Sequence, residues 1–124
     1  MKILECTHCG NQVMMTRDAG VPMICCGEEM KVLKAGEVDA ALEKHVPAYT
    51  LDGKLLHVVI GEVPHPMLKE HWIEWIAVEQ GDRVQMEKLD YTDEPKATFT
   101  IDETKPFTIY EHCNLHGLWK KDKE

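Results

Sequence analysis

The chain has 124 residues, of which 44% are hydrophobic, and its formal net charge is −8 at pH 7. This length fits one ordinary domain, or a small domain attached to a medium one, and the apolar fraction is sufficient for a packed core. The acidic balance argues against nucleic acid or an anionic membrane as a main partner. No apolar run approaches the ~18 residues that a bilayer-spanning helix needs. Residues 1–6 lack the apolar core of a signal peptide, so a cytoplasmic protein is expected.

Cysteines dominate residues 1–35, which we interpret as a first domain. Cys6 and Cys9 form a Cys-x-x-Cys motif, and the adjacent pair Cys25 and Cys26 follows after residues 10–24. In a reducing compartment this pattern favours metal ligation over disulfides. So short a segment buries too little surface to fold alone, so a metal or a partner subunit has to contribute. Four thiolates suit a tetrahedral site, and they do not by themselves choose between zinc and iron.

Few regular elements are predicted before residue 48. Strands are expected over residues 12–17 and 21–24, with a turn at residues 18–20. Asp39 is a candidate cap for a short turn through residues 40–42. Pro47 biases Val46 towards an extended backbone, so a helix in this joining segment should end near His45.

From residue 48 onwards the pattern predicts only β-strands within a second domain, residues 36–124. Turn signals such as Asp52-Gly53 and Gly81-Asp82 separate seven short candidates. These candidates are Ala48–Leu51, Lys54–Glu62, His71–Glu79, Arg83–Leu89, Ala97–Ile101, Phe107–His112 and Gly117–Lys120. Their regular spacing favours an all-β fold with an antiparallel β-sandwich of the immunoglobulin type. The three tryptophans are expected in its core or in a cavity wall, and Lys120–Glu124 in a charged tail.

Five residues of the second domain have the chemistry of metal ligands. Cys113 and His116 lie three apart just before a glycine, a spacing that lets a thiolate and an imidazole turn towards one point. His65 stands between two prolines, which fits a rigid loop better than an interior strand. His45 and His71 have similar proline-rich or loop-like settings. Any one of these histidines alone is more often a surface or packed residue, but four of them with one thiolate are hard to explain in that way.

Three histidines are left outside this set. His8 lies within the Cys-x-x-Cys loop, and His57 lies in an alternating strand. His112 precedes Cys113 and should point to the opposite face of the same strand.

These motifs resemble two known classes of iron protein. The Cys-x-x-Cys motif with its later Cys-Cys pair resembles desulforedoxin. Four other stretches resemble the catalytic domain of superoxide reductases, namely Glu43-Lys44-His45-Val46-Pro47, Pro64-His65-Pro66-Met67, Glu70-His71-x-x-Glu74-Trp75 and Cys113-Asn114-Leu115-His116-Gly117. Together the two parts resemble the desulfoferrodoxin family, the two-iron class of superoxide reductase. The region between Arg83 and Lys105 carries no motif.

The resemblance implies two iron centres and their ligands. In the first, a rubredoxin-like iron is held by Cys6, Cys9, Cys25 and Cys26. In the second, Cys113 is the axial ligand of an iron whose equatorial ligands are His45, His65, His71 and His116. Proteins of this family are intertwined homodimers with an immunoglobulin-like catalytic domain.

The resemblance also implies an activity. Superoxide, one electron and two protons give hydrogen peroxide, and an external donor such as rubredoxin supplies the electron. The glutamate that matches Glu43 ligates the oxidised iron in this family, and the lysine that matches Lys44 attracts the anion and guides protonation. Because the overall charge of −8 repels superoxide, local positive charge has to dominate at the site.

Two other functions are compatible with parts of the pattern. A β-sandwich with Cys-x-x-His near its end is also a trait of blue-copper carriers, but these need a weak axial ligand soon after the histidine, and no Met follows Met86. A zinc-stabilised module without catalysis leaves His45, His65 and His71 unused. A visible spectrum separates the three, because thiolate–iron bands, a single blue band and a colourless protein are different outcomes.

Overall fold

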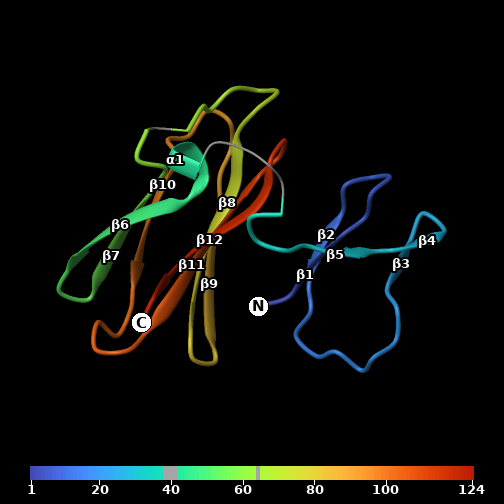
Figure 1. Cartoon of the computed structure of the whole chain (residues 1–124), viewed down its shortest axis with the longest axis horizontal. Coiled ribbons are helices and arrows are strands. Elements are labelled where there is room, and N and C mark those ends of the chain that lie inside the picture. The colour runs from blue at the N-terminus through green and yellow to red at the C-terminus, as the bar shows by residue number, and fades with distance from the viewer. Residues whose placement is uncertain (38–41, 64) are drawn as a thin grey trace. The chain divides into compact units, whose positions relative to one another are not determined.

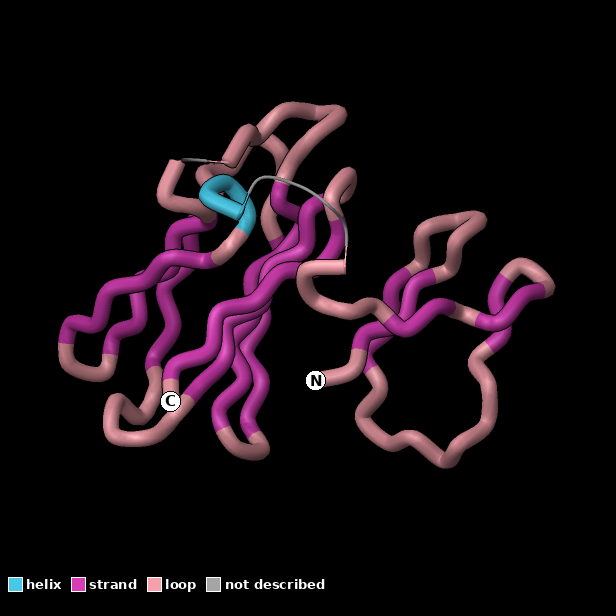
Figure 2. The backbone as a smooth tube through the Cα atoms, in the orientation of Figure 1, coloured by secondary structure: helices cyan, strands magenta, loops and turns pink. Residues whose placement is uncertain are grey.

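The computed structural model describes residues 1–37, 42–63 and 65–124. The backbone divides into two compact units, Met1–Lys34 and Ala35–Glu124 (Figure 1). Within the described residues, strands make up nearly all the regular structure, as Figure 2 shows, and the short helix α1 spans Leu42–His45. The predicted all-β class is therefore confirmed. Among these residues, none of the helical structure is long and apolar enough to cross a membrane. Asp39 and its predicted cap lie outside the described residues.

The first unit is built from two small antiparallel sheets. A three-stranded sheet has the order β2-β1-β5, with β1 at Ile3–Glu5, β2 at Gln12–Met14 and β5 at Lys31–Val32. A two-stranded sheet pairs β3, Ile24–Cys25, with β4, Glu28–Glu29. Its core cluster contains Leu4, Cys6 and Met30, with partly buried side chains packed against them. So small a core agrees with the expectation that a metal or a partner contributes to stability.

The two strands predicted in this unit are shorter than expected. Residues 15–17 lie outside β2, because its partner β1 offers only three residues for pairing. Residues 21–23 are not a strand, and Pro22 has no amide hydrogen to donate to a ladder. The turn between them is present, and the Gly20 amide donates to Oδ1 of Asp18 over 2.8 Å.

The second unit is a sandwich of two antiparallel sheets. One sheet has the order β10-β7-β6 and the other the order β12-β11-β8-β9. The strands are β6 Pro47–Asp52, β7 Leu55–Ile60, β8 Ile73–Gln80, β9 Arg83–Lys88, β10 Lys96–Thr100, β11 Phe107–Cys113 and β12 Gly117–Lys123. One sheet thus contains the first, second and fifth strands of this unit, and the other sheet contains the remaining four. Two antiparallel sheets divided in this way form an immunoglobulin-like sandwich.

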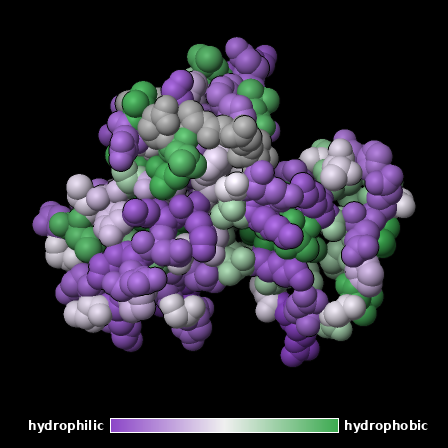
Figure 3. Space-filling view, viewed as in Figure 1, coloured by the Kyte–Doolittle hydropathy of each residue, from purple (hydrophilic) through white to green (hydrophobic). Residues whose placement is uncertain are grey.

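Alternation along the strands places the core between the two sheets. In β7, Leu56, Val58 and Ile60 are almost fully buried, while Val59 between them is exposed. They pack with inward-facing side chains of the opposite sheet, including Ile76 and Ile109. Each buried aliphatic side chain of this size contributes about 1.5–3 kcal/mol to folding. The face of the sandwich seen in Figure 3 is mostly hydrophilic, and several of its green, apolar patches lie at the end that carries α1.

All seven predicted strands are present with bounds that differ by one to three residues, and two of these differences have clear reasons. The strand expected from His71 begins at Ile73, because β11 ends at Cys113, which pairs with Ile73, and offers no partner beyond it. The expected charged tail is largely strand, because β12 pairs with β11 as far as Lys123 opposite Phe107. The first correction matters most, since it leaves His71 in a loop.

Candidate metal centres

Five potential ligands of the second unit converge at one end of the sandwich. His45 ends α1, His65 and His71 lie in the loop between β7 and β8, and Cys113 and His116 flank the turn between β11 and β12. Figure 1 shows these three segments at the same end. Their ligand atoms all lie within 4.8 Å of one another. We call these five residues the histidine–cysteine group.

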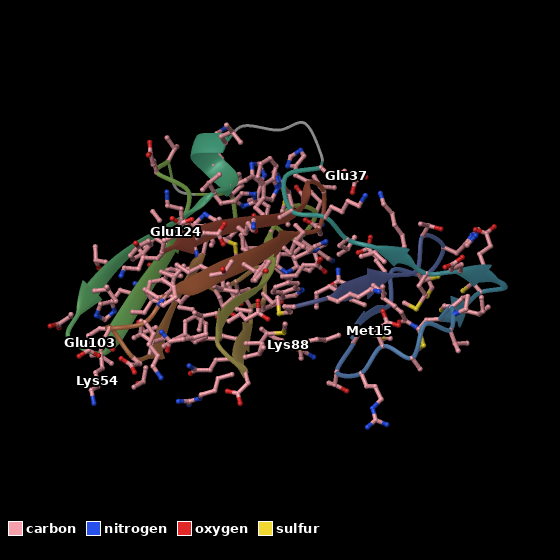
Figure 4. All side chains as sticks on the ribbon, turned by 60° about the horizontal axis from the view of Figure 1, so that its bottom comes forward. Met15, Glu37, Lys54, Lys88, Glu103 and Glu124 are labelled. Atoms are coloured by element: carbon pink, nitrogen blue, oxygen red, sulfur yellow. The ribbon has the colours of Figure 1, made fainter. Side chains whose placement is uncertain are left out.

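The four imidazole rings form a closed square. Neighbouring ring centroids are 4.8 Å apart for His45–His65 and for His65–His71, 5.1 Å for His71–His116, and 4.8 Å for His45–His116. Each ring is nearly perpendicular to the next, with interplanar angles between 77° and 89°. Figure 4, in which nitrogen is blue, shows nitrogen-rich side chains gathered beside α1. This arrangement turns one nitrogen of each ring towards a shared centre.

The nitrogen atoms identify which side of each ring faces that centre. Nε2 of His45 is 3.0 Å from Nδ1 of His116 and 3.3 Å from Nε2 of His65. The Nδ1–H of His65 donates to the Pro66 carbonyl over 2.7 Å, which leaves the lone pair of its Nε2 for a metal. Nε2 of His71 is buried and has no hydrogen-bond partner among the described residues. Lone pairs this close, with one ring nitrogen left unsatisfied, fit a metal ion at their centre.

Cys113 supplies the sulfur of the group from the core side. It is completely buried, and its Sγ lies 3.8 Å from Nδ1 of His116. Burial raises the pKa of the Cys113 thiol, whereas hydrogen bonds from the backbone amides of Leu115 and His116 act in the opposite direction. Gly117 ends the turn with a φ of 80°, a conformation that favours glycine. A bound cation would offset the burial cost and hold the thiolate form.

Burial lowers the pKa of two of the imidazoles, which favours the neutral form that binds metals. It lowers the pKa of His65 to about 4, against the hydrogen bond to Pro66, which raises it. The pKa of His71 is also lowered, first by burial and then by the positive charges of His116 and Lys44. His45 stacks on Trp119 with centroids 5.1 Å apart, and the indole of Trp119 donates to the His116 carbonyl over 3.0 Å. The group is therefore prepared for a cation before one binds.

The four cysteines of the first unit form a second ligand group. Sγ atoms of Cys6, Cys9, Cys25 and Cys26 lie within 4.8 Å of one another, and all five cysteines of the chain are free thiols. Cys6 is buried, whereas Cys9 and Cys26 are exposed. The adjacent pair is accommodated by Cys26, whose φ of 53° lies in the left-handed region. We call these residues the four-cysteine group.

Hydrogen bonds within the four-cysteine group lower the pKa of the Cys6 thiol and raise the pKa values of Cys25 and Cys26. Backbone hydrogen bonds from Cys9 and His8 lower the pKa of Cys6 to about 6. Hydrogen bonds with Cys6 and Cys9 raise the pKa of the Cys25 thiol. Hydrogen bonds with Cys6, Cys9 and Cys25 raise the pKa of the Cys26 thiol to about 12. Four thiolates at this separation need a cation, which is what a tetrahedral metal site provides.

The structure brings together every candidate metal ligand predicted from the sequence, in two groups. Lys44 lies in α1 with an exposed side chain, whereas the side chain of Glu43 is outside what the structure describes. His8, His57 and His112 join neither group of described ligands. His8 pairs with Glu28 over 3.1 Å, and His57 contacts Oγ1 of Thr98 over 3.0 Å.

Two contributors near the site were not found by sequence reasoning. His112 is buried on the outer face of its sheet, where its Nδ1 lies 2.7 Å from a carboxylate oxygen of Glu74 and its ring stacks on Trp75. Asn114 bonds to the loop that carries His71. The position of Asn114 inside the Cys-x-x-His motif could have drawn attention to this residue. Its hydrogen-bond partners, however, are set only by the fold.

The donor set of the second unit also differs from that of a blue-copper site. Blue-copper sites use two histidines, one cysteine and a weak axial ligand. Here four imidazoles and one thiol lie close together, which is two imidazoles more than a blue-copper site uses. A zinc-stabilised module has no use for the histidine square.

Comparisons with known proteins agree with this geometry. The sequence model of the Desulfoferrodoxin family matches residues 37–122. The chain is 43% identical over 122 residues to the desulfoferrodoxin of Nitratidesulfovibrio vulgaris, covering 98% of this chain and 95% of the relative. The superoxide reductase from Treponema pallidum matches with a TM-score of 0.75 at 32% identity, covering 95% of this chain and 98% of that one. A one-iron superoxide reductase from Giardia intestinalis matches with a TM-score of 0.60 at 30% identity, covering 66% of this chain and 98% of that one.

The one-iron neighbour covers a smaller share of the chain than the Treponema pallidum enzyme, which matches across nearly all of it. The four-cysteine group and the histidine–cysteine group are both present, in the two units where the resemblance predicted two iron centres. Family match, fold and donor sets thus agree, and the chain belongs to the desulfoferrodoxin family.

Proposed function

We propose that this protein is a superoxide reductase that acts at the histidine–cysteine group. The reaction joins superoxide, one electron and two protons to give hydrogen peroxide, without forming oxygen. The observation that carries the proposal is the square of four imidazoles above one buried thiol, in a chain whose structural neighbours are named superoxide reductases. When bound there, iron supplies the one-electron chemistry and the position at which the anion binds.

The chain's own residues support this chemistry by their charge and burial. Four neutral imidazoles add no negative charge against an anionic substrate, and the Cys113 thiolate adds one negative charge from the core side. His45 and His65 are buried, while His71 and His116 are partly exposed, so the square is reached from solvent along their side. The substrate is small enough that a narrow approach suffices. Glu43, the residue before Lys44, is proposed to ligate the metal in its oxidised state.

Lys44 is proposed to attract superoxide and to guide its protonation. Its side chain is exposed, and its charge is close enough to His71 to lower the pKa of that imidazole. An ammonium group near the open side of the square is the local positive charge that an overall net charge of −8 requires.

Lys44→Glu should slow the bimolecular reaction with superoxide roughly tenfold at low salt. At about 6 Å in a water-like dielectric one charge pair contributes roughly 0.7 kcal/mol, so reversing the charge removes about 1.4 kcal/mol. Pulse radiolysis measures the rate directly, and added salt should reduce the difference because exposed charges are screened.

Lys54→Glu is the matched control for that charge reversal. It changes the net charge equally, but Figure 4 shows Lys54 at the turn between β6 and β7, away from α1. The control should react at close to the wild-type rate. Equal rates for wild type and Lys44→Glu at low salt would remove the steering role.

An external protein is proposed to supply the electron, with rubredoxin or a similar small carrier as the donor. Aliphatic side chains on the segments that carry the ligands are exposed, namely Leu42, Val63, Leu68 and Leu115. Apolar surface around a redox centre suits a transient contact with such a donor. We further propose a homodimer in the cytoplasm, where a reducing environment keeps five free thiols available for metal binding.

Product stoichiometry tests the proposed activity. Reduced, iron-loaded protein mixed with superoxide should give one peroxide per superoxide consumed and no oxygen. Dismutation instead gives one peroxide and one oxygen for two superoxide ions. Oxygen release with halved peroxide yield therefore contradicts the proposal, and metal-free protein provides the background rate.

A further inference from the structure

The side chain of Asn114 joins two loops that carry different ligands. It stands in the turn between β11 and β12, next to Cys113 and two residues before His116. We propose that Asn114 is a positioning residue that fixes His71 relative to Cys113 and His116. This inference rests on the proposed assignment of these three residues as ligands of one metal.

Three hydrogen bonds attach Asn114 to the residues on both sides of His71. The Asn114 amide nitrogen Nδ2 donates to the Glu70 carbonyl over 3.0 Å. The Trp72 backbone amide donates to Oδ1 of Asn114 over 2.9 Å. The Asn114 backbone amide in turn donates to the Trp72 carbonyl over 3.2 Å. The peptide segment of His71 is thus held before and after the ligand by one side chain.

His71 needs such an anchor because it lies outside the sheet. Strand β8 begins two residues later, at Ile73. The backbone of His71 exchanges two hydrogen bonds with Leu68, at 2.9 Å and 3.0 Å, and these close the loop on itself. The bonds to Asn114 connect that closed loop to the turn that carries Cys113 and His116. Small displacements of a ligand-bearing loop weaken a metal site, because the donor atoms have to stay within a few tenths of an ångström of their positions.

The chemistry of this position calls for an amide. Asparagine offers a donor and an acceptor in one plane, and both are used here. Aspartate has the same shape and keeps the acceptor for Trp72, but it has no hydrogen to donate to Glu70. Alanine removes both side-chain bonds and leaves the backbone bond.

The test compares Asn114→Ala and Asn114→Asp with matched changes at Gln80. Gln80 makes the same kind of bridge at the other end of β8, where its Nε2 donates to the Asp102 carbonyl over 2.7 Å and its Oε1 accepts from the Asp102 amide over 2.9 Å. The same Nε2 also donates to the Lys105 carbonyl over 3.2 Å. Gln80→Ala therefore removes three side-chain bonds far along the strand from the ligands, and Gln80→Glu removes the two that Nε2 donates.

Ferrous iron affinity is the decisive measurement. All three tryptophans lie in the second unit, and Trp119 stacks on His45, so tryptophan fluorescence reports metal binding at the histidine–cysteine group. Titration of metal-free protein against a competing chelator should show about 10–100-fold weaker binding for Asn114→Ala, a smaller loss for Asn114→Asp, and unchanged affinity for both Gln80 variants. The thiolate–iron absorption band should also shift in the Asn114 variants.

Thermal unfolding of the metal-free forms separates positioning from general stability. Both alanine variants should unfold at lower temperatures than the wild type, because Asn114→Ala loses two side-chain bonds and Gln80→Ala loses three. Wild-type iron affinity in Asn114→Ala, or an equal loss in Gln80→Ala, would overturn the positioning role. Asn114→Asp retains the bond to Trp72 and serves as the test if the alanine variant does not fold. None of these readouts uses superoxide, so their outcome is independent of the proposed reaction.

Discussion

Cys113→Ser should fold but lose the thiolate–iron absorption band and nearly all superoxide reduction. Cys113 is the only cysteine of the second unit, so its loss removes the sulfur donor altogether. Mutation of a residue that only hydrogen-bonds to a metal ligand already lowers metal affinity or activity by about 10–100-fold. Because Cys113 is itself a proposed ligand, we expect the rate to fall by at least about 100-fold. Pulse radiolysis and the visible spectrum of the oxidised protein measure the two effects.

The fold should survive this change because the hydroxyl keeps partners. The backbone amides of Leu115 and His116 that donate to the sulfur can donate to a serine oxygen instead. An unsatisfied hydroxyl in this fully buried position would cost about 1–3 kcal/mol, and these donors reduce that cost. Circular dichroism checks the folded state. Wild-type turnover in Cys113→Ser would exclude the thiolate from the reaction without affecting the family assignment.

Cys9→Ser should release the metal of the first unit and unfold residues 1–34, while iron stays in the histidine–cysteine group. The two ligand groups share no residue and lie in separate compact units. The first unit has only a small buried core, so its folding free energy depends largely on its metal. Metal analysis should show one iron per chain instead of two, and amide hydrogen exchange should show lost protection confined to residues 1–34.

His8→Ala is the control for that variant. His8 lies between Cys6 and Cys9, and its exposed side chain contacts Glu28 over 3.1 Å, a surface contact of a kind that contributes about 0–1 kcal/mol. Its backbone amide, which lowers the pKa of Cys6, is kept. The control should retain both irons. Loss of both irons from Cys9→Ser would refute the independence of the two units.

Much of the fold followed from local pattern. Turn signals and alternating strands predicted the sandwich, and the bounds of most strands agree to within two residues of those observed. Two of the strand bounds that differ in the second unit, at His71 and at the charged end of β12, depend on how long the neighbouring strand β11 continues. A sequence pattern indicates which residues prefer a strand conformation. It does not indicate how long the neighbouring strand in the sheet is.

The chemistry of the side chains predicts which residues are candidate ligands. It does not predict that these residues come together in space. The residue types, the proline-flanked His65 and the Cys-x-x-His spacing identify a metal-binding set in one dimension. Only the tertiary structure places His45 next to His116, 71 positions later, with ring nitrogens 3.0 Å apart.

The sequence by itself therefore determined which side chains are available for two metal centres and which elements carry them, because ligand chemistry and strand periodicity are local properties. The tertiary structure alone decided which ring nitrogens face one another and that Asn114 joins the loops of His71 and Cys113. These features depend on contacts between segments far apart in the chain, and the free energy of those contacts is set by packing that only the folded state provides.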